Sequence, residues 1–212
     1  NVTFSGNSAG VGGGMENHSG SNPTLMSVTF SGNSARFFGG GMLNVDSTVP
    51  QIRNTIFWGN TAPSGAQIRN LYDGSNPSVS DSVIQGGCPE GSICTNIIIT
   101  DPMLGALGNY GGFTQTVPLE TGSSAIDMGN SAACPATDQR GEVRPWGAGC
   151  DIGAFEYVVP LGAFGKLGPT DAETGVSLSP TLFWQPSSGV TSYEYCYSSA
   201  PGPCTKWNSV GG

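Results

Sequence analysis

Side chains that could carry out acid–base or metal chemistry are concentrated between residues 127 and 156. They are Asp127, Asp138, Arg140, Glu142, Arg144, Asp151 and Glu156. Loop carboxylates suit calcium, which prefers hard oxygen ligands, and the candidate ligands are Asp127, Asp138, Asp151 and Glu156. Arginine beside aspartate would alternatively serve the acid–base step of a lyase. We favour a third interpretation, in which these charges pair off in a hydrogen-bonded network that fixes irregular loops.

The first part of the chain offers few other ionisable groups. Between Val2 and Gly87 there is no lysine, and the acids are Glu16, Asp46, Asp73 and Asp81. Polysaccharide cleavage requires two or three ionisable groups held together in a cleft. We therefore expect no catalytic residue, no enzyme activity and no cofactor, apart from calcium if the acidic stretch binds it.

Six cysteines fall in three near pairs: Cys88 with Cys94, Cys134 with Cys150, and Cys196 with Cys204. A zinc site would need closer spacing or histidines, and His18 is the only histidine. We expect three local disulfides, which form in oxidising compartments. The protein is therefore expected to be extracellular or on a cell surface.

A repeated pattern must position these groups. One block is written three times, as VTFSGNSA at residues 2–9 and 28–35 and as TIFWGNTA at 55–62. A second block, GGGMEN, GGGMLN or GAQIRN, recurs at the same spacing of 26 to 27 residues. Self-similarity at this period indicates a solenoid. Because the blocks are short, rich in β-branched and aromatic residues, and bounded by Gly, Asn and Ser, we predict coils of strands.

Stacked coils place equivalent side chains in columns about 4.8 Å apart. We predict one interior column of Phe4, Phe30, Phe57 and Ile84, and a second of Met15, Met42 and Ile68. A third column contains the turn residues Asn7, Asn33 and Asn60, whose amides can donate and accept between coils. One repeat is a residue longer than the other, and we place the extra residue in a loop around Arg36 to Phe38.

The paired motifs F-x-G-N-[ST]-A and G-G-G-[MI]-x-N resemble the repeats of bacterial right-handed parallel β-helix surface proteins, including the polymorphic outer-membrane protein type. The match covers about residues 1–87. It implies an all-β, single-stranded, right-handed parallel β-helix over residues 1–95. It also implies a stalk whose exposed loops contact glycans or proteins.

The segment 96–157 has almost no periodicity, and we expect an irregular cap. Its motifs AIDMGN at 125–130, DQRGEVRP at 138–145 and DIGAFEY at 151–157 resemble the tail of bacterial β-helix surface proteins known as the choice-of-anchor Q region. The resemblance implies that the cap closes the C-terminal end of the β-helix. It implies no catalytic residue.

A Pro/Gly-containing linker is predicted at 158–169, followed by a third segment at 170–212. TLFW at 181–184 and SYEYCYSS at 192–199 are expected to form strands. Tyr193, Tyr195 and Tyr197 would share one face, with Trp184 against them. This pattern looks like part of a fibronectin type III or Ig-like sandwich, which needs about 100 residues. We therefore expect both ends of the chain to be cuts in a longer protein.

Composition and net charge limit the classes of molecule that the chain is expected to bind. With 34 Gly, 15 Pro and only 10% charged residues among 212, the chain has an all-β profile. Its net charge of −8 disfavours binding to nucleic acid and to anionic lipid. No run of 18 apolar residues exists, so no membrane insertion is expected. We expect a monomer whose partners are glycans or surface proteins.

Three classes of function remain. The first is a non-enzymatic bacterial cell-surface or secreted protein, an adhesive or structural stalk, in which Trp58 and Phe38, if exposed, would form a contact strip. The alternative is a polysaccharide lyase or hydrolase of the pectate-lyase-like β-helix type. The third, ice binding, needs a flat array of threonines. In this chain Thr3 and Thr29 are followed in their column by Ile56 and Val83, so the array stops.

Overall fold

The computed structural model describes residues 1–72, 74–159, 166–170, 174–177, 181–184, 192–196 and 207–211. They fall into two compact units, Asn1–Val158 and Val159–Gly212. Strands, turns and loops make up nearly all of the described chain, and its one helical element is a 3-10 turn, η1, at Ser131–Ala133. The predicted all-β class is confirmed.

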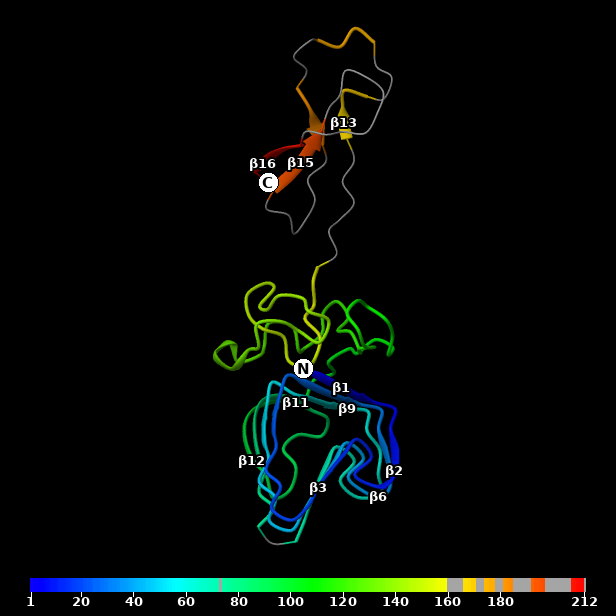
Figure 1. Ribbon diagram of the computed structural model, residues 1–212, viewed down its shortest axis with the longest axis vertical. Coiled ribbons are helices and arrows are strands. Elements are labelled where there is room, and N and C mark those ends of the chain that lie inside the picture. The colour runs from blue at the N-terminus through cyan, green and yellow to red at the C-terminus, as the bar shows by residue number, and fades with distance from the viewer. Residues whose placement is uncertain are drawn as a thin grey trace. The chain divides into compact units, whose positions relative to one another are not determined.

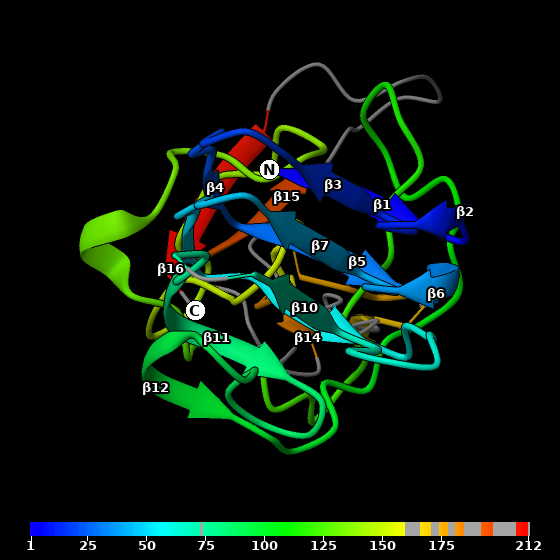
Figure 2. The ribbon, with the colours of Figure 1, turned by 90° about the horizontal axis from the view of Figure 1, so that it is seen from below.

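The first unit contains a β-solenoid of about three turns (Figure 1). Its main sheet runs in the order β1 (Val2–Ser5), β5 (Val28–Ser31), β9 (Ile56–Trp58), β11 (Ser78–Ile84), β8 (Gln51–Arg53) and β4 (Thr24–Met26), with β12 (Ile93–Ile98) paired to β11. A second sheet contains β3 (Met15–Asn17), β7 (Met42–Val45) and β10 (Ile68–Leu71), and a third pairs β2 (Ser8–Val11) with β6 (Ser34–Phe38). All these pairs are parallel. Figure 2 shows β3, β7 and β10 as neighbouring strands from successive coils.

Both interior columns have the predicted register. Phe4 lies opposite Phe30, Phe30 opposite Phe57, and Ile84 opposite Phe57. The three phenyl rings stack with centroid separations of 4.7 and 4.5 Å and interplanar angles of 6° and 4°. The second column places Met42 between Met15 and Ile68, and the two columns pack into one hydrophobic core.

The turn column is also confirmed. Asn7 Nδ2 donates to Asn33 Oδ1, and Asn33 Nδ2 donates to Asn60 Oδ1, both at 2.9 Å. The backbone N–H groups of Asn7 and Asn33 donate to the same two oxygens. The glycine that precedes each asparagine has a φ between 64° and 68°, a left-handed conformation that glycine adopts without steric cost. Each of these turns is therefore held to the next coil by hydrogen bonds of the asparagine side-chain amide.

A second amide ladder runs through the other repeated block. Asn17 Nδ2 donates to Asn44 Oδ1 at 2.8 Å, and Asn44 Nδ2 donates to Asn70 Oδ1 at 2.9 Å. Asn17 and Asn44 are buried, so these bonds satisfy amides that water does not reach.

The extra residue of the second repeat lies between Ala35 and Phe38, where it was predicted, but this segment is a strand and the expectation of a loop is wrong. Ala9 is opposite Ala35, but Val11 is opposite Phe38, which puts the insertion inside β6. A bulge accommodates one added residue in a ladder while leaving the flanking pairs in register.

The irregular segment that follows β12 covers a flank of the solenoid (Figure 1). Asn1 Nδ2 donates to Thr137 O at 2.6 Å, and Thr3 Oγ1 donates to Gln139 Oε1 at 2.7 Å, both from the first coil. Further along the same sheet, Ile56 and Val83 pack against cap residues such as Ile152. The cap thus lies along the main sheet across successive coils, and the expectation that it closes the end of the β-helix is wrong.

The predicted division at residues 95 and 96 does not separate two units. Strand β12 crosses it, and solenoid and cap belong to one compact body that ends at Val158. The boundary expected after residue 157 agrees with the structure to one residue. The physical reason is that the cap shares a hydrophobic core with the sheet.

The described residues of the second unit form two antiparallel strand pairs. β13 (Lys166–Gly168) pairs with β14 (Phe183–Trp184), and β15 (Ser192–Cys196) pairs with β16 (Trp207–Gly211). The two predicted strands thus exist as β14 and β15, and the Trp184 ring lies 5.4 Å from that of Tyr193. The predicted linker is wrong in its last residues, which form β13. Tyr197 and Cys204 lie outside the described residues.

Candidate functional site

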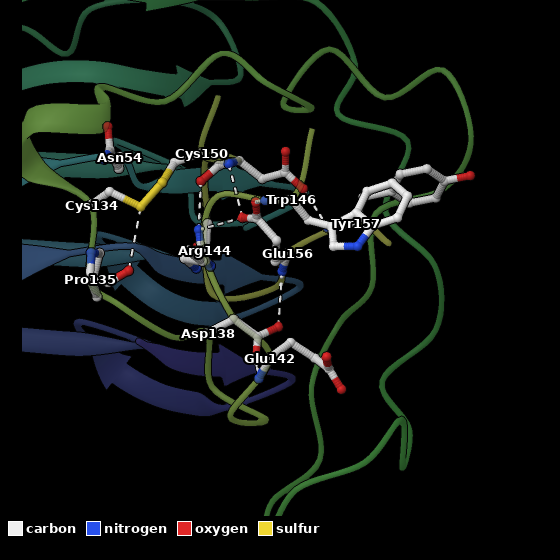
Figure 3. A network of polar contacts seen from close by, with 12 residues as sticks. Asn54, Cys134, Pro135, Asp138, Glu142, Arg144, Trp146, Cys150, Glu156 and Tyr157 are labelled. Carbon is white, nitrogen blue, oxygen red and sulfur yellow. Dashed lines mark hydrogen bonds and ion pairs between the residues drawn. A yellow bond between two sulfur atoms is a disulfide. The ribbon is translucent and has the colours of Figure 1, made fainter. Parts of the chain in front are cut away.

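Asp138, Arg144 and Glu156 come together beside the main sheet, whereas the side chain of Glu142 is exposed and lies apart (Figure 3). Gly153 shows how closely the loops approach, since a Cβ there would lie 2.7 Å from Ile56 Cδ1 and 2.9 Å from Thr29 Oγ1. Its φ of 103° also requires glycine. Thr29 Oγ1 accepts a 3.0 Å hydrogen bond from Ala154 N, which fixes the loop to the second coil.

Asp138 is the acceptor for one half of the network. Its Oδ1 accepts hydrogen bonds from Arg140 N at 2.7 Å and Glu142 N at 3.1 Å. Its Oδ2 accepts from Arg140 Nε at 2.8 Å and from Glu156 N at 3.0 Å. Arg140 also lies 3.5 Å above the ring of Phe155. The carboxylate is buried, and all four contacts hold it in place as a loop anchor.

Arg144 and Glu156 form the second half of the charged network. Arg144 Nη1 lies 3.1 Å from Glu156 Oε2, and both side chains are fully buried. Glu156 Oε1 accepts from Trp146 N at 2.7 Å, while Oε2 also accepts from Asp151 N at 3.1 Å. Arg144 donates in addition to the carbonyl oxygens of Asp151 and Gly153, at 2.8 and 2.7 Å. The two opposite charges compensate each other in the interior, although the buried Arg144 Nε has no hydrogen-bond partner among the described residues.

Asp151 links this pair to the AIDMGN loop. Its Oδ1 accepts from Asp127 N at 2.8 Å, and its Oδ2 accepts from Tyr157 N. Burial raises the pKa of Asp151 to about 7, although the two N–H donors act in the opposite direction. Burial also raises the pKa of Glu156 and lowers that of Arg144. These shifts follow from the dry surroundings of the network.

The four candidate calcium ligands do not surround a common point. In the part of the chain that the structure describes, no three His, Cys, Asp or Glu side chains form a group able to hold a metal ion. Asp127, the most accessible of the four, uses Oδ1 to accept from Gly149 N at 2.9 Å. The arrangement matches the interpretation of these residues as an ion-paired network that fixes loops.

Two of the three expected disulfides are present. Cys88 is bonded to Cys94, which lies in β12, and Cys134 is bonded to Cys150 within the cap. The third predicted pair includes Cys204 and therefore lies outside the described residues.

The acids of the coils are not all scattered. Glu16 Oε1 lies 2.7 Å from His18 Nε2, and Asp46 Oδ2 lies 3.8 Å from His18 Nδ1, with all three side chains exposed. Asp81 is distant in sequence and accepts from Asn96 Nδ2 at 2.9 Å. Asp73 lies outside the described residues.

Two surfaces considered from sequence are partly covered. Trp58 is half-buried against the core beneath the cap, whereas Phe38 is exposed, so these two aromatics do not form the predicted strip. Thr29, Ile56 and Val83 are buried, which removes their column from the surface as a flat array.

An open polar groove lies beyond the third coil, where sequence reasoning placed nothing. One hollow of about 460 Å³ is lined by β10 and by the segment Gln85–Glu90. A second, of about 290 Å³, includes Tyr72 and Gly91 and shares Arg69, Asn70 and Glu90 with the first. The signal that sequence offers is faint, namely that the third copy of the second block reads GAQIRN where the others carry GGGM. The copy thus adds glutamine and arginine at the last coil.

The described residues include no helix long and apolar enough to span a bilayer. Comparison with protein families, curated proteins and solved structures gave no match to this chain.

Proposed function

We propose that this chain is a non-enzymatic bacterial surface or secreted protein of the parallel β-helix repeat kind. In this proposal the solenoid is a rigid stalk that presents surface grooves and loops to glycans or proteins. The protein is extracellular and acts as a monomer. Two disulfides in one compact unit fit an oxidising compartment.

The observation that carries the proposal is the state of the ionisable groups. The cluster with the most ionisable groups, around Asp138, Arg144 and Glu156, is buried. Its carboxylate oxygens accept hydrogen bonds from backbone N–H groups. A catalytic acid or base needs to reach the substrate proton within hydrogen-bond distance. Groups that are buried and bonded in this way serve the fold, whereas the groove beyond the third coil is open and polar.

The proposal is tested by separating binding from turnover. The chain is incubated with pectin, alginate and a neutral glucan in the presence of calcium, while unsaturated products and reducing ends are followed. We expect saturable binding to at least one polymer and no product. The exposed acids Glu16 and Asp46 provide the control, because their replacement leaves the buried network intact. Turnover that disappears in Glu16→Gln or Asp46→Asn would contradict the proposal and support the lyase or hydrolase alternative.

A further inference from the structure

The groove beyond the third coil has a floor and a wall of different origin. Its floor is β10, one of the two edge strands of the second sheet. Its wall is the segment Gln85–Gly91, whose last residues lie in the loop that the Cys88–Cys94 disulfide closes. The larger hollow, at about 460 Å³, is in the range of small-molecule sites. Amides, backbone and an arginine dominate its lining, where most such sites are apolar.

The end of the asparagine ladder orients the amides of the groove. Asn60 Nδ2 donates to Gln67 Oε1 at 2.7 Å, and Gln67 Nε2 donates to Gln85 Oε1 at 3.0 Å. Gln85 Oε1 also accepts from Gly59 N at 2.8 Å. Nothing in the described part of the chain accepts a hydrogen bond from Gln85 Nε2, which therefore remains as a donor for a ligand hydroxyl.

Arg69 is the one cation among the described residues that line the groove, and its hydrogen-bonding capacity is only partly used. Its Nη1 lies 3.4 Å from Glu90 Oε2, and the Glu90 side chain is 91% exposed. Its Nε is buried and has no partner among the described residues. One long contact to an exposed carboxylate is weak. A guanidinium presents a planar fork that pairs with a carboxylate through two parallel bonds. A ligand carboxylate could therefore displace Glu90.

The smaller hollow adds an aromatic ring and a second buried polar atom. Tyr72 lies at its rim with 75% of its surface exposed. Ser75 lines the same hollow, and its buried Oγ has no partner among the described residues. An exposed tyrosine offers a flat apolar face beside a polar tip, which suits stacking against a sugar ring. Each hollow is thus lined by a residue that carries a buried polar atom without a hydrogen-bond partner among the described residues.

We propose that this groove is a binding site for an acidic oligosaccharide, with Arg69 holding a uronate carboxylate and Tyr72 stacking on the adjoining sugar. The inference rests on the proposed function and gives it a site and a ligand class. An extended peptide added to the edge of β10 is the competing occupant. Asn70 Nδ2 donates to Glu90 O at 2.8 Å and to Ser92 Oγ at 3.0 Å, so the loop is already tied to the end of that strand. Because the loop already occupies the end of the β10 edge, we favour the saccharide over an added peptide strand.

The test measures the affinity of the full chain by titration calorimetry for tri-galacturonate and for the matching neutral galactose trimer. We expect the uronate to bind and the neutral trimer to bind at least about tenfold more weakly, because the charge-assisted fork is lost. Arg69→Gln should weaken uronate binding by about tenfold or more. Glu90→Gln should strengthen it by about threefold, because a competing carboxylate is removed. Tyr72→Ala should weaken both ligands.

Arg36→Ala is the matched control, because Arg36 is exposed on the solenoid and lies 5.2 Å from the ring of Phe37, away from the groove lining. It should leave affinity unchanged, and urea unfolding of each variant checks that the fold is retained. Uronate binding that is insensitive to Arg69→Gln and Glu90→Gln would overturn the groove assignment while leaving the proposed function standing. Binding of a strand-forming peptide in place of the uronate would overturn the ligand class. Absence of binding to any glycan or peptide would overturn both proposals.

Discussion

The stacked phenylalanine column gives the sharpest stability prediction. Phe30 is fully buried, with a parallel ring on each side at 4.7 and 4.5 Å. Phe30→Ala removes the transfer free energy of the ring and leaves a cavity, which together destabilise by about 3–5 kcal/mol. Loss of two stacked pairs places the expected change in the free energy of unfolding near the upper end of that range.

The neighbouring Phe4 has only one such ring partner and is partly exposed. Phe4→Ala should therefore cost about 1–2 kcal/mol, because less apolar surface returns to water. Phe30→Leu keeps most of the apolar volume but loses the stacking, and should cost about 1–1.5 kcal/mol. Phe37, which is 50% exposed, is the control, and its replacement by alanine should stay within about 0.5 kcal/mol.

Urea unfolding followed by far-UV circular dichroism measures all four variants on one scale. The ranking Phe30→Ala, then Phe30→Leu and Phe4→Ala, then Phe37→Ala is required by the ladder. Equal costs for Phe30→Ala and Phe4→Ala would refute the claim that both faces of the central ring are packed. A cost of Phe30→Ala below about 1 kcal/mol would refute its burial.

Two further predictions concern the amide ladder and the cap. Asn33→Ala should destabilise by about 2–4 kcal/mol in the same urea assay, because the backbone and side-chain N–H groups of Asn7 lose their acceptor and the buried Oδ1 of Asn60 loses one of its two donors. Asn7→Ala at the first coil should cost less. Burial raises the pKa of Asp151 to about 7, above its ordinary value of 3.8, so the unfolded chain releases this proton first as the pH rises. The free energy of unfolding should therefore fall between about pH 4 and pH 7, and Asp151→Asn should flatten that slope; an unchanged slope would contradict the assignment.

The periodic part of the fold was predictable because a repeat fixes register by itself. Once Phe4, Phe30 and Phe57 are recognised as equivalent, parallel stacking places them opposite one another, and each column follows. The chemistry of asparagine then predicts the bonds between successive turns, since an amide both donates and accepts.

The position of the cap was missed, although the repeats contain a sign of it. Strand alternation points the residue before each phenylalanine away from the core. That outward column reads Thr3, Thr29, Ile56 and Val83, and an exposed column has no physical reason to turn apolar. Ile56 and Val83 are fully buried beneath the cap. The change from threonine to branched aliphatic residues therefore marked the surface on which an aperiodic segment would pack.

The same comparison explains why the cap network was foreseen as a structural element while the groove was not. Seven charged residues in 30 positions of one segment indicate a cluster. Loops outside a sheet need side chains to form hydrogen bonds with their backbone N–H and C=O groups. The groove instead brings together Arg69 and Glu90, and Glu90 lies in a turn that is not part of the repeat. The other polar side chains of its lining are amides, which look in the sequence like ordinary ladder residues. The amide contacts that start at Asn60 continue to Gln67 and then to Gln85; Gln67 is buried, whereas Gln85 is exposed at the groove. The third repeat thus departs from the pattern at β10, where the second sheet ends, and in our proposal the side chains exposed there bind the ligand.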